Sequence, residues 1–417
     1  MPRRLALSLL IAWLAWIPTV SAQGPIREGM PESGFHGMVS GDPYAGRTAP
    51  AYYQQQPTLQ EQLLPTSRGP FYDMDSVSDL GLAETFSRTW FRAEYLLLNY
   101  RDPDVHFLGA TPATLDPNSF FPAIDRITGV RPNLEAGVPN LQAADNRNNN
   151  GFRLTMGIPT QLFTFEASVF AMGMTESQLQ FPLFVDVNNI LSPVVIPVIP
   201  LTRNGVPSDV DFILFDQGLD VKLRTNLQGT DIKFVFGALT PNLGTEVAPL
   251  IGFNYVRLAN EIIIRGDDAA SGTSHLIESN AYNNIYGPEI GLRMETRGKW
   301  VTLGFEPKFT FGINSMKNRV RTEQIFDPLE ANRLINDRLT RFSPVIELAT
   351  TARIRLAENV SLSLGYQFMA TTSVSFAERN INWDSSSLLA APPQIRLDQQ
   401  RSDFWMQGIN VGLQWQF

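Results

Sequence analysis

The sequence of 417 residues contains no cysteine, which excludes disulfide scaffolds, thiol chemistry and zinc sites built on cysteine. Acidic residues outnumber basic ones, and the formal net charge is −8. Because phosphate binding requires a basic surface, nucleic acid is not an expected partner. Beyond the N-terminus no apolar run is long enough to cross a bilayer as a helix.

Aromatic residues, in contrast, are abundant. The chain contains 27 Phe, 10 Tyr and 7 Trp, which is too much apolar surface for a solvated, disordered chain. Hydrophobic residues make up 43% of the sequence and charged residues 18%. The composition therefore predicts a folded, moderately polar protein.

The N-terminus carries the pattern of an export signal. Arg3 and Arg4 precede the apolar stretch 5–17, and a proline and small residues ending at Ala22 follow. A basic start, a short apolar core and a small-residue cleavage site predict a secretory signal peptide over 1–22. The next stretch, 23–88, is rich in Pro, Gly and Gln without a lasting apolar period, which predicts a flexible leader. Residues 89–417 remain as the main folded region.

Strict alternation of apolar and polar residues dominates this region. Such a period of two is typical of strands with two different faces. In the last stretch, Trp405 and Trp415 lie on the same apolar face, whereas small and polar residues occupy the other. The alternation predicts strands over 90–99, 151–158, 162–171, 218–225, 249–264, 282–296, 301–314, 345–356, 360–374 and 405–417.

The fold class follows from strand length and from the composition of the two faces. The stretches reach 11 to 17 residues, whereas strands of soluble sheets are usually near five or six. Polar faces rich in Gly, Ser and Thr suit a crowded interior, and aromatics near the ends of the apolar stripe are typical of membrane interfaces. We predict an all-β transmembrane antiparallel barrel of about ten strands. Trp405, Trp415 and Phe417 are its candidate aromatic girdle.

The connections between strands are of two kinds. Tight turns are expected at 159–160, 297–299 and 358–359, and long outer loops at 101–150, 175–217, 265–281, 315–341 and 376–401. Long loops outside and short periplasmic turns are typical of outer-membrane barrels. This assignment counts 226–248 as one connection. Twelve strands are the alternative, with 231–237 pairing near 209–215.

Two proline positions carry separate expectations. Pro307 lies inside an expected strand, which predicts a local bulge because proline lacks the donor for a ladder hydrogen bond. The apolar segment 190–201 contains three prolines, so it is not expected to be a central strand or a helix. We expect an apolar loop that packs on the barrel, and the alternatives are that it folds back as a plug or lies at the membrane surface.

The alternation assigns a nearly balanced set of charges to the lumen. Balanced charges are typical of a structural interior in which ions pair, and a ten-stranded barrel is narrow. A plugged or narrow pore is therefore favoured over an open one. The basic members are Arg92, Arg153, Lys222, Arg224, Arg293, Lys308, Arg353 and Arg355, and the acidic members are Glu94, Glu166, Asp220, Glu289, Glu295, Glu306 and Glu347.

No catalytic, cofactor-binding or metal-binding constellation is expected. The three histidines, His36, His106 and His275, lie in the leader or in expected loops without metal-ligand spacing. The only candidate for a hydrolase is His275 beside Ser271 and Ser274, which is a weak match. A barrel-borne hydrolase is accordingly the least favoured alternative. A secreted soluble β-sandwich that binds carbohydrate is the other alternative.

Several segments resemble, in the same order, a bacterial family of outer-membrane β-barrel porins, the seventh in the series of that name. The resemblance spans about 90–417 and is carried by WFRAEYLL at 90–97, GFRLTMG at 151–157, LIGFNYVRL at 250–258, YGPEIG at 286–291, LGYQ at 364–367 and GINVGL at 408–413. It departs from the family in the long leader and at 231–246, which looks like an insertion.

The resemblance implies a location in the outer membrane of a double-membrane bacterium and a porin role. It supplies no catalytic or ligand-binding residue. A terminal aromatic such as Phe417 is typical of chains that the barrel-assembly machinery recognises. Expected partners are therefore outer-membrane lipid, that machinery and small solutes. The oligomeric state and the identity of a solute do not follow from the sequence.

Overall fold

The fold was analysed in a computed structural model, which describes residues 88–101, 107–110, 114–125, 129–144, 147–183, 194–239, 244–385, 395–398 and 400–417. The chain divides into two units, 1–66 and 67–417, and all described residues belong to the second. The predicted signal peptide and leader lie outside the described residues, apart from Arg88, and stay predictions. Among the described residues, no helix has the length and apolar character needed to cross a membrane.

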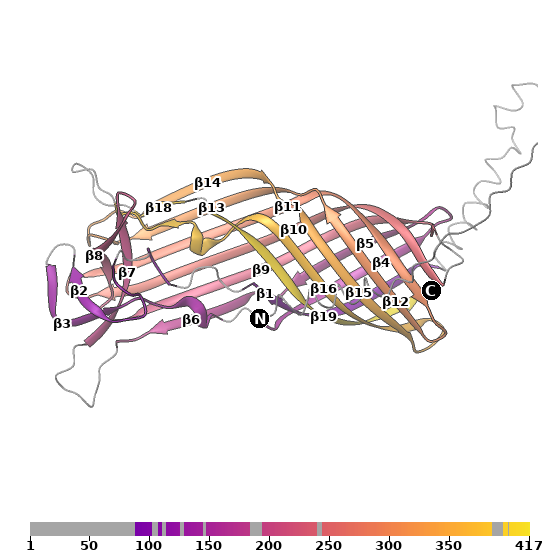
Figure 1. Ribbon diagram of the computed structural model, residues 1–417, viewed down its shortest axis with the longest axis horizontal. Coiled ribbons are helices and arrows are strands. Elements are labelled where there is room, and N and C mark those ends of the chain that lie inside the picture. The colour runs from indigo at the N-terminus through magenta and orange to yellow at the C-terminus, as the bar shows by residue number, and fades with distance from the viewer. Residues whose placement is uncertain are drawn as a thin grey trace, which may run out of the picture. The chain divides into compact units, whose positions relative to one another are not determined.

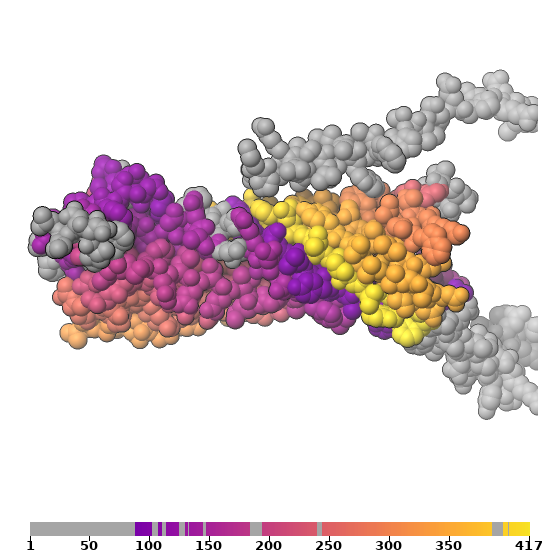
Figure 2. Space-filling view, turned by 90° about the horizontal axis from the view of Figure 1, so that it is seen from below, coloured from indigo at the N-terminus to yellow at the C-terminus, as the bar shows by residue number. Residues whose placement is uncertain are grey.

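Ten antiparallel strands close into a barrel (Figure 1), as the alternation predicts. The ring consists, in spatial order, of β1 (Trp90–Tyr100), β4 (Asn149–Pro159), β5 (Phe163–Met172), β9 (Leu219–Phe236), β10 (Thr245–Asp268), β11 (Thr273–Arg297), β12 (Val301–Thr310), β15 (Val345–Arg355), β16 (Val360–Ser375) and β19 (Arg401–Gln416). β1 pairs with β19 from Trp90↔Gln416 to Tyr100↔Met406, so the first and last strands lie side by side (Figure 2). This closure excludes the two-sheet sandwich.

Beyond one end of the ring, part of the sheet continues as a wall. β6 (Thr175–Phe181) pairs with β9, β13 (Ile313–Glu323) with β11, and β14 (Arg333–Phe342) with β13. These strands prolong β5, β12 and β15 past short interruptions. We call β6, β13, β14 and the adjoining halves of β9, β10 and β11 the extended wall. We call the end of the barrel that carries the extended wall the cap end, and the opposite end of the barrel the turn end.

Much of what was expected as loop at the cap end is strand. The segment 265–281 belongs to the β10–β11 hairpin, whose connection comprises only 269–272. The segment 315–341 contains most of β13 and β14, and 175–217 contains β6 and two further strands. The twelve-strand alternative is wrong, because β9 continues to Phe236 within the ring. Pro307 produces no bulge, since the register of β12 with β15 is unbroken there.

A small second sheet lies at the cap end (Figure 1). It has the order β2 (Phe121–Asp125), β3 (Gly129–Gly137), β7 (Val194–Arg203) and β8 (Val206–Leu214). The expectation that 190–201 is not a central strand is wrong for 194–201, because β7 is an inner strand of this sheet, whereas the expected packing on the barrel is confirmed by Ile199 and Leu201. Pro197 ends the parallel pairing with β3, and the register with β8 shifts after Pro200. The prolines thus lie where the ladder stops or is irregular.

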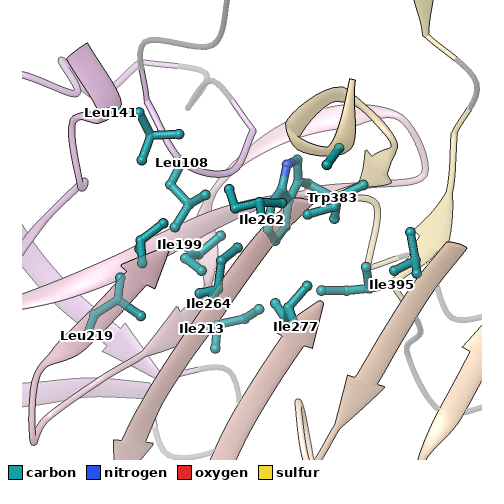
Figure 3. Close-up of a cluster of buried hydrophobic side chains, with 14 of the residues drawn as sticks. Leu108, Leu141, Ile199, Ile213, Leu219, Ile262, Ile264, Ile277, Trp383 and Ile395 are labelled. Carbon is teal, nitrogen blue, oxygen red and sulfur yellow. The ribbon is translucent and has the colours of Figure 1, made fainter. Parts of the chain in front are cut away.

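The cap, defined as this sheet with the segments 107–110, 138–144, 376–385 and 395–398, packs on the inner face of the extended wall. It includes the short elements η1 (Leu141–Ala143), η2 (Ala377–Arg379), β17 (Ile381–Asn382) and β18 (Arg396–Leu397). Figure 3 shows the buried cluster between the cap and the extended wall, with Ile199 of the cap beside Ile264 of the wall. Apolar burial of this kind holds the cap in place.

Candidate functional site

Strand β9 shows how the inner face of the barrel changes along its length. Its odd-numbered residues face inward throughout. Near the cap end these are apolar, such as Val221 and Leu223, and they pack in the cap core. Nearer the turn end they are Asp231 and Lys233, which contact charges from other strands. The lumen is therefore lined by charged residues only in the part nearer the turn end.

The outer face of β9 is polar and charged near the cap end and apolar nearer the turn end. Three charged residues that were predicted to line the lumen therefore lie outside. Lys222, Arg224 and Asp220 were expected inside, but they lie on the outer face of the extended wall. Arg224 Nε is 2.9 Å from Glu176, and Lys222 Nζ is 3.9 Å from Asp220. The prediction fails because it assumed that apolar residues always face lipid, whereas here they face the cap.

The other predicted charges lie inside, except that Arg355 is exposed at the turn end. Together with two residues that the prediction missed they form what we call the charged layer. Its members are Arg92, Glu94, Arg153, Glu166, Asp231, Lys233, Glu289, Arg293, Glu295, Glu306, Lys308, Glu347 and Arg353. The layer remains nearly balanced, as predicted for a structural interior.

Arg293 of β11 anchors one half of the charged layer. Its two terminal nitrogens donate to both oxygens of Glu166 on β5, at 2.6 and 2.7 Å, and its Nε donates to Glu306 on β12 at 2.7 Å. Lys233 of β9 also contacts Glu306, and its Nζ lies 3.6 Å from Glu166. The Arg293–Glu166 and Lys233–Glu306 contacts cross the barrel between strands that are not neighbours in the ring, whereas the other two join neighbouring strands.

Lys308 of β12 anchors a second group. Its Nζ lies 2.8 Å from Asp231, 2.8 Å from Glu347 and 3.2 Å from Glu289. Asn254 of β10 donates to Glu347 at 2.5 Å and to Glu289 at 3.3 Å. One ammonium group thus holds three carboxylates that would otherwise repel one another.

The opposite side of the barrel holds a third group around Glu94 of β1. Asn410 donates to Glu94 at 2.6 Å, while Arg92 and Arg153 lie 3.4 and 3.9 Å from the same carboxylate. Arg353 reaches Glu295 at 2.5 Å. Every acidic member of the layer has a cationic neighbour, so the described residues that line the lumen form no ring of one sign. Such a ring is what charge-selective pores use.

Asp231 and Lys233 were missed because 226–248 was read as a connection. The period of two along the strand could have found them. Counting on in steps of two from the buried Leu227 places both residues inward. Asn254 was missed for a different reason, since only charged residues were assigned to the lumen.

A cavity of about 110 Å³ lies within the charged layer. Its lining extends from Trp90 and Arg353 near the turn end to Met369 and Met406 higher in the barrel. This volume corresponds to a few water molecules, since each occupies about 30 Å³ in the liquid. The charged layer therefore leaves a narrow polar space rather than a wide channel.

Above the charged layer, apolar side chains from strands around the ring meet in the middle of the barrel. We call this cluster the plug. Leu98 and Leu227 are fully buried, and Leu258 is 1% exposed. Its buried members are Leu96, Leu98, Tyr100, Met172, Leu227, Val256, Leu258, Ile285, Val345, Met369, Val374, Phe404 and Met406.

The segment after β16 folds back over the plug. Ser373 has a left-handed backbone, φ 57°, and the β16–β19 register shifts between Thr371 and Val374. Asn283 of β11 then holds Ser375 through two hydrogen bonds of 2.8 Å, one from its side-chain NH₂ and one to its side-chain oxygen. The amide of Ala377 donates to Asn260 of β10 at 2.9 Å. The charged layer, the plug and this segment together fill the barrel along its axis.

The outer surface of the ring carries an apolar belt. Each of the ten strands contributes at least one exposed large hydrophobic residue: Phe91, Phe152, Val169, Ile232, Phe253, Ile290, Leu303, Ile346, Leu364 and Val411. Ten residues separate Trp405 from Trp415, which is about 33 Å along a strand and about 25 Å along the axis of a tilted barrel. That height matches the apolar band of membrane barrels. The girdle role of Trp405, Trp415 and Phe417 remains a prediction.

The hydrolase candidate does not assemble. His275 is 5% exposed, with Nε2 2.9 Å from Thr273 Oγ1 and Nδ1 2.7 Å from the carbonyl oxygen of Gln324. Ser274 donates to Asp267 instead, at 2.6 Å. Burial lowers the pKa of His275. Within the described part of the chain, no group of acidic residues and histidines is arranged to hold a metal ion.

Asp268, in the same region, ties the cap to the wall. Arg131 of β3 donates to both of its carboxylate oxygens, at 2.8 and 2.7 Å, and Ser271 donates at 2.8 Å. Burial alone would raise the pKa of Asp268, but these bonds outweigh it and lower the pKa to about 2.

A closed barrel with an apolar belt outside and paired charges inside defines a transmembrane β-barrel protein. Residues 90–417 match the family model described as "Putative beta barrel porin-7", and the chain belongs to this family. Membership indicates a porin-like barrel of the bacterial outer membrane. The resemblance stated from the sequence is thereby confirmed over the same residues.

Comparison with curated proteins gives no match. Among solved structures, the chain is similar to the translocator domain of the autotransporter NalP from Neisseria meningitidis, with 8% identity, a TM-score of 0.34, and coverage of 83% of this chain and 96% of that one. It is also similar to the toluene transporter TodX from Pseudomonas putida, with 9% identity, a TM-score of 0.27, and coverage of 79% and 90%.

Proposed function

We propose that this protein is an outer-membrane barrel with a closed lumen, which anchors the cap at the cell surface. The observation that carries the proposal is the plug. A pathway for water and ions would have to pass through side chains such as Leu98 and Leu227, which are fully buried. Moving charge through apolar, dewetted space is costly, so the plug favours a closed barrel.

The proposed orientation follows from the two ends. Short connections at 160–162, 298–300 and 356–359 join strands at the turn end, and the cap lies at the other. In outer-membrane barrels the short turns face the periplasm and the larger connections face outward. The cap would then be presented to the medium on the extended wall.

Planar-bilayer recordings test the closed lumen. We expect the purified, full-length protein to give no stable single-channel conductance. A variant with Leu98→Ser, Leu227→Ser and Leu258→Ser should conduct, because hydroxyl groups let water enter the plug. The matched control replaces the outward residues Leu292 and Leu303 by serine and should stay silent. Steady conductance of the unmodified protein would overturn the proposal.

A second function is favoured by the cavity in the charged layer. Its lining from Trp90 to Met406 suggests a partial path that would become a narrow solute passage if the plug moved. The same recordings distinguish the two functions. Gated passage would be supported by brief openings of the unmodified protein that disappear in Val256→Phe. This variant enlarges the plug and leaves Asn283 unchanged.

Single-cysteine labelling tests the orientation, because the absence of native cysteine leaves the background clean. Leu329 lies between β13 and β14 at the cap end and is 92% exposed, and Glu358 lies in an exposed connection at the turn end. A maleimide that does not cross membranes should label Leu329→Cys on whole cells. It should label Glu358→Cys only after the cells are broken, and the reverse pattern would refute the orientation.

A further inference from the structure

The outer face of the extended wall is organised in rows that run across β10, β11, β13 and β14. The register places Tyr255, Tyr286, Ile313 and Phe342 in one row, which is the upper limit of the apolar belt on these strands. Of these, Phe342 is 58% exposed and Ile313 44%. Acyl chains would therefore contact this row.

Cations occupy the rows immediately above. Two residues further along the strands comes the row Arg257, Asn284, Ser315 and Thr340, and the next is Ala259, Tyr282, Lys317 and Arg338. The row after that is Glu261, Asn280, Arg319 and Asn336, in which Glu261 is paired with Arg224 of β9. At about 3.3 Å per residue, Lys317 lies about 13 Å along its strand from Ile313, or about 10 Å above the belt at the usual tilt. The row of Arg257 lies about half as high, so the cations extend from within the headgroup layer, which is about 5 to 8 Å thick, to its outer edge.

These cations are not neutralised by carboxylates. Within the described part of the chain, Lys317 and Arg338 form no ion pair, and both are exposed. Arg319 Nε is buried and has no hydrogen-bond partner there. Arg257 lies over the ring of Tyr282, 5.8 Å from its centroid. On the β9 side of the same wall, by contrast, Arg224 is paired with Glu176 and Glu261.

We propose that Arg257, Lys317, Arg319 and Arg338 form a binding site for the phosphates of the glycolipid in the outer leaflet, beside the β13–β14 part of the extended wall. The apolar row below takes the acyl chains, and the unpaired cations take the phosphate groups of the sugar headgroup. Arginine and lysine suit this role because they donate several hydrogen bonds to phosphate oxygens. The site fixes the height of the barrel in the leaflet on one side.

The test uses lipid A, the phosphorylated glycolipid, as the probe. It compares the binding of lipid A to the full-length protein in detergent with the binding of the same glycolipid without phosphates. We expect the unmodified protein to prefer the phosphorylated form. Each cation removed should weaken binding about fivefold, so Arg257→Gln, Lys317→Gln and Arg338→Gln together should weaken it roughly a hundredfold. Neither measurement depends on whether the lumen conducts, so failure here is distinct from failure of the proposed function.

The matched control carries Lys222→Gln, Arg224→Gln and Arg265→Gln, which removes the same charge from another part of the wall. It should keep lipid A binding to within about fivefold. Equal loss in both triple variants, or no preference of the unmodified protein for phosphorylated lipid, overturns the proposal. Heat-modifiable migration on a gel establishes that each variant is folded. If the triple variant does not fold, Lys317→Gln alone should still weaken binding about fivefold, and an unchanged affinity overturns the site.

Discussion

Lys308 provides the sharpest test of the charged layer as a structural element. Replacing it by methionine keeps most of the side-chain volume but removes an ammonium that lies within 3.2 Å of Asp231, Glu289 and Glu347, and the next ammonium among the described residues, Lys233, is 3.8 Å from Asp231. Its side chain is 6% exposed, so water cannot readily replace it. The three carboxylates would then be left to repel one another inside the barrel.

The expected magnitude follows from these distances. At an effective dielectric constant of about 20, one carboxylate about 3 Å from an ammonium attracts it by about 5 to 6 kcal/mol, and desolvation offsets most of the sum. Removing one partner of a buried ion pair typically costs about 3 to 5 kcal/mol. Because three carboxylates share Lys308, we expect Lys308→Met to lower the free energy of unfolding by about 5 kcal/mol.

Urea unfolding in lipid vesicles, followed by tryptophan fluorescence, measures this loss. Adding Glu347→Gln removes one negative charge while keeping an acceptor for Asn254, and it should recover roughly half of the loss. The control Lys222→Met changes a partly exposed lysine of the outer face and should alter stability by less than about 0.5 kcal/mol. If Lys308→Met unfolds at the same urea concentration as the unmodified protein, the charged layer does not stabilise the barrel.

Four further predictions concern the plug, the folded-back segment, the bond between cap and wall at Asp268, and the buried His275. Leu258→Ala should lower the free energy of unfolding by about 2 to 5 kcal/mol in the same urea assay, because it leaves a cavity in the plug. Asn283→Ala removes two hydrogen bonds to Ser375 and should make the segment that folds back after β16 sensitive to protease. Unchanged cleavage would show that Asn283 does not hold this segment in place. The lowered pKa of Asp268 implies stability that is present above pH 3.8 and is lost as the pH falls towards about 2, so cap cleavage by an acid-stable protease should rise over that window and be independent of pH there in Asp268→Asn. The lowered pKa of His275 favours its neutral form, so its contribution is present above pH 6.5 and is lost as the pH falls through the lowered pKa; His275→Gln should remove that part of the pH dependence of the melting temperature.

The sequence predicted the ring because lipid imposes one rule on every strand there. Wherever a residue such as Phe253 or Leu303 faces lipid, its neighbours in the sequence face a polar interior. The alternation therefore predicts both the strand and the direction of each side chain. The extended wall breaks this agreement. On β10, Ile262 is apolar and faces the cap, while Glu261 faces outward. The period is the same, but the polar and apolar faces are exchanged.

This exchange explains which site residues were found. Glu166, Arg293 and Lys308 lie level with the belt, where the lipid rule holds, and their inward direction could be read from alternation. Lys222 lies level with the cap, where the same rule gives the wrong face. The pairings themselves, such as Arg293 with Glu166 across the barrel, were not predictable, because they depend on register between strands distant in sequence.

The pairing of β1 with β19 sets the order in which the barrel can form. Asn410 and Glu94, which meet across this seam, are 316 positions apart in the chain. The β10–β11 hairpin, in contrast, closes through a connection of four residues and pairs from Thr245↔Thr296 to Asp268↔Thr273. Local pairing loses less chain entropy than distant pairing, so this hairpin should form early and the seam last. Until the seam closes, β1 and β19 both present unpaired edges, and an assembly factor that holds either edge would govern the rate of insertion.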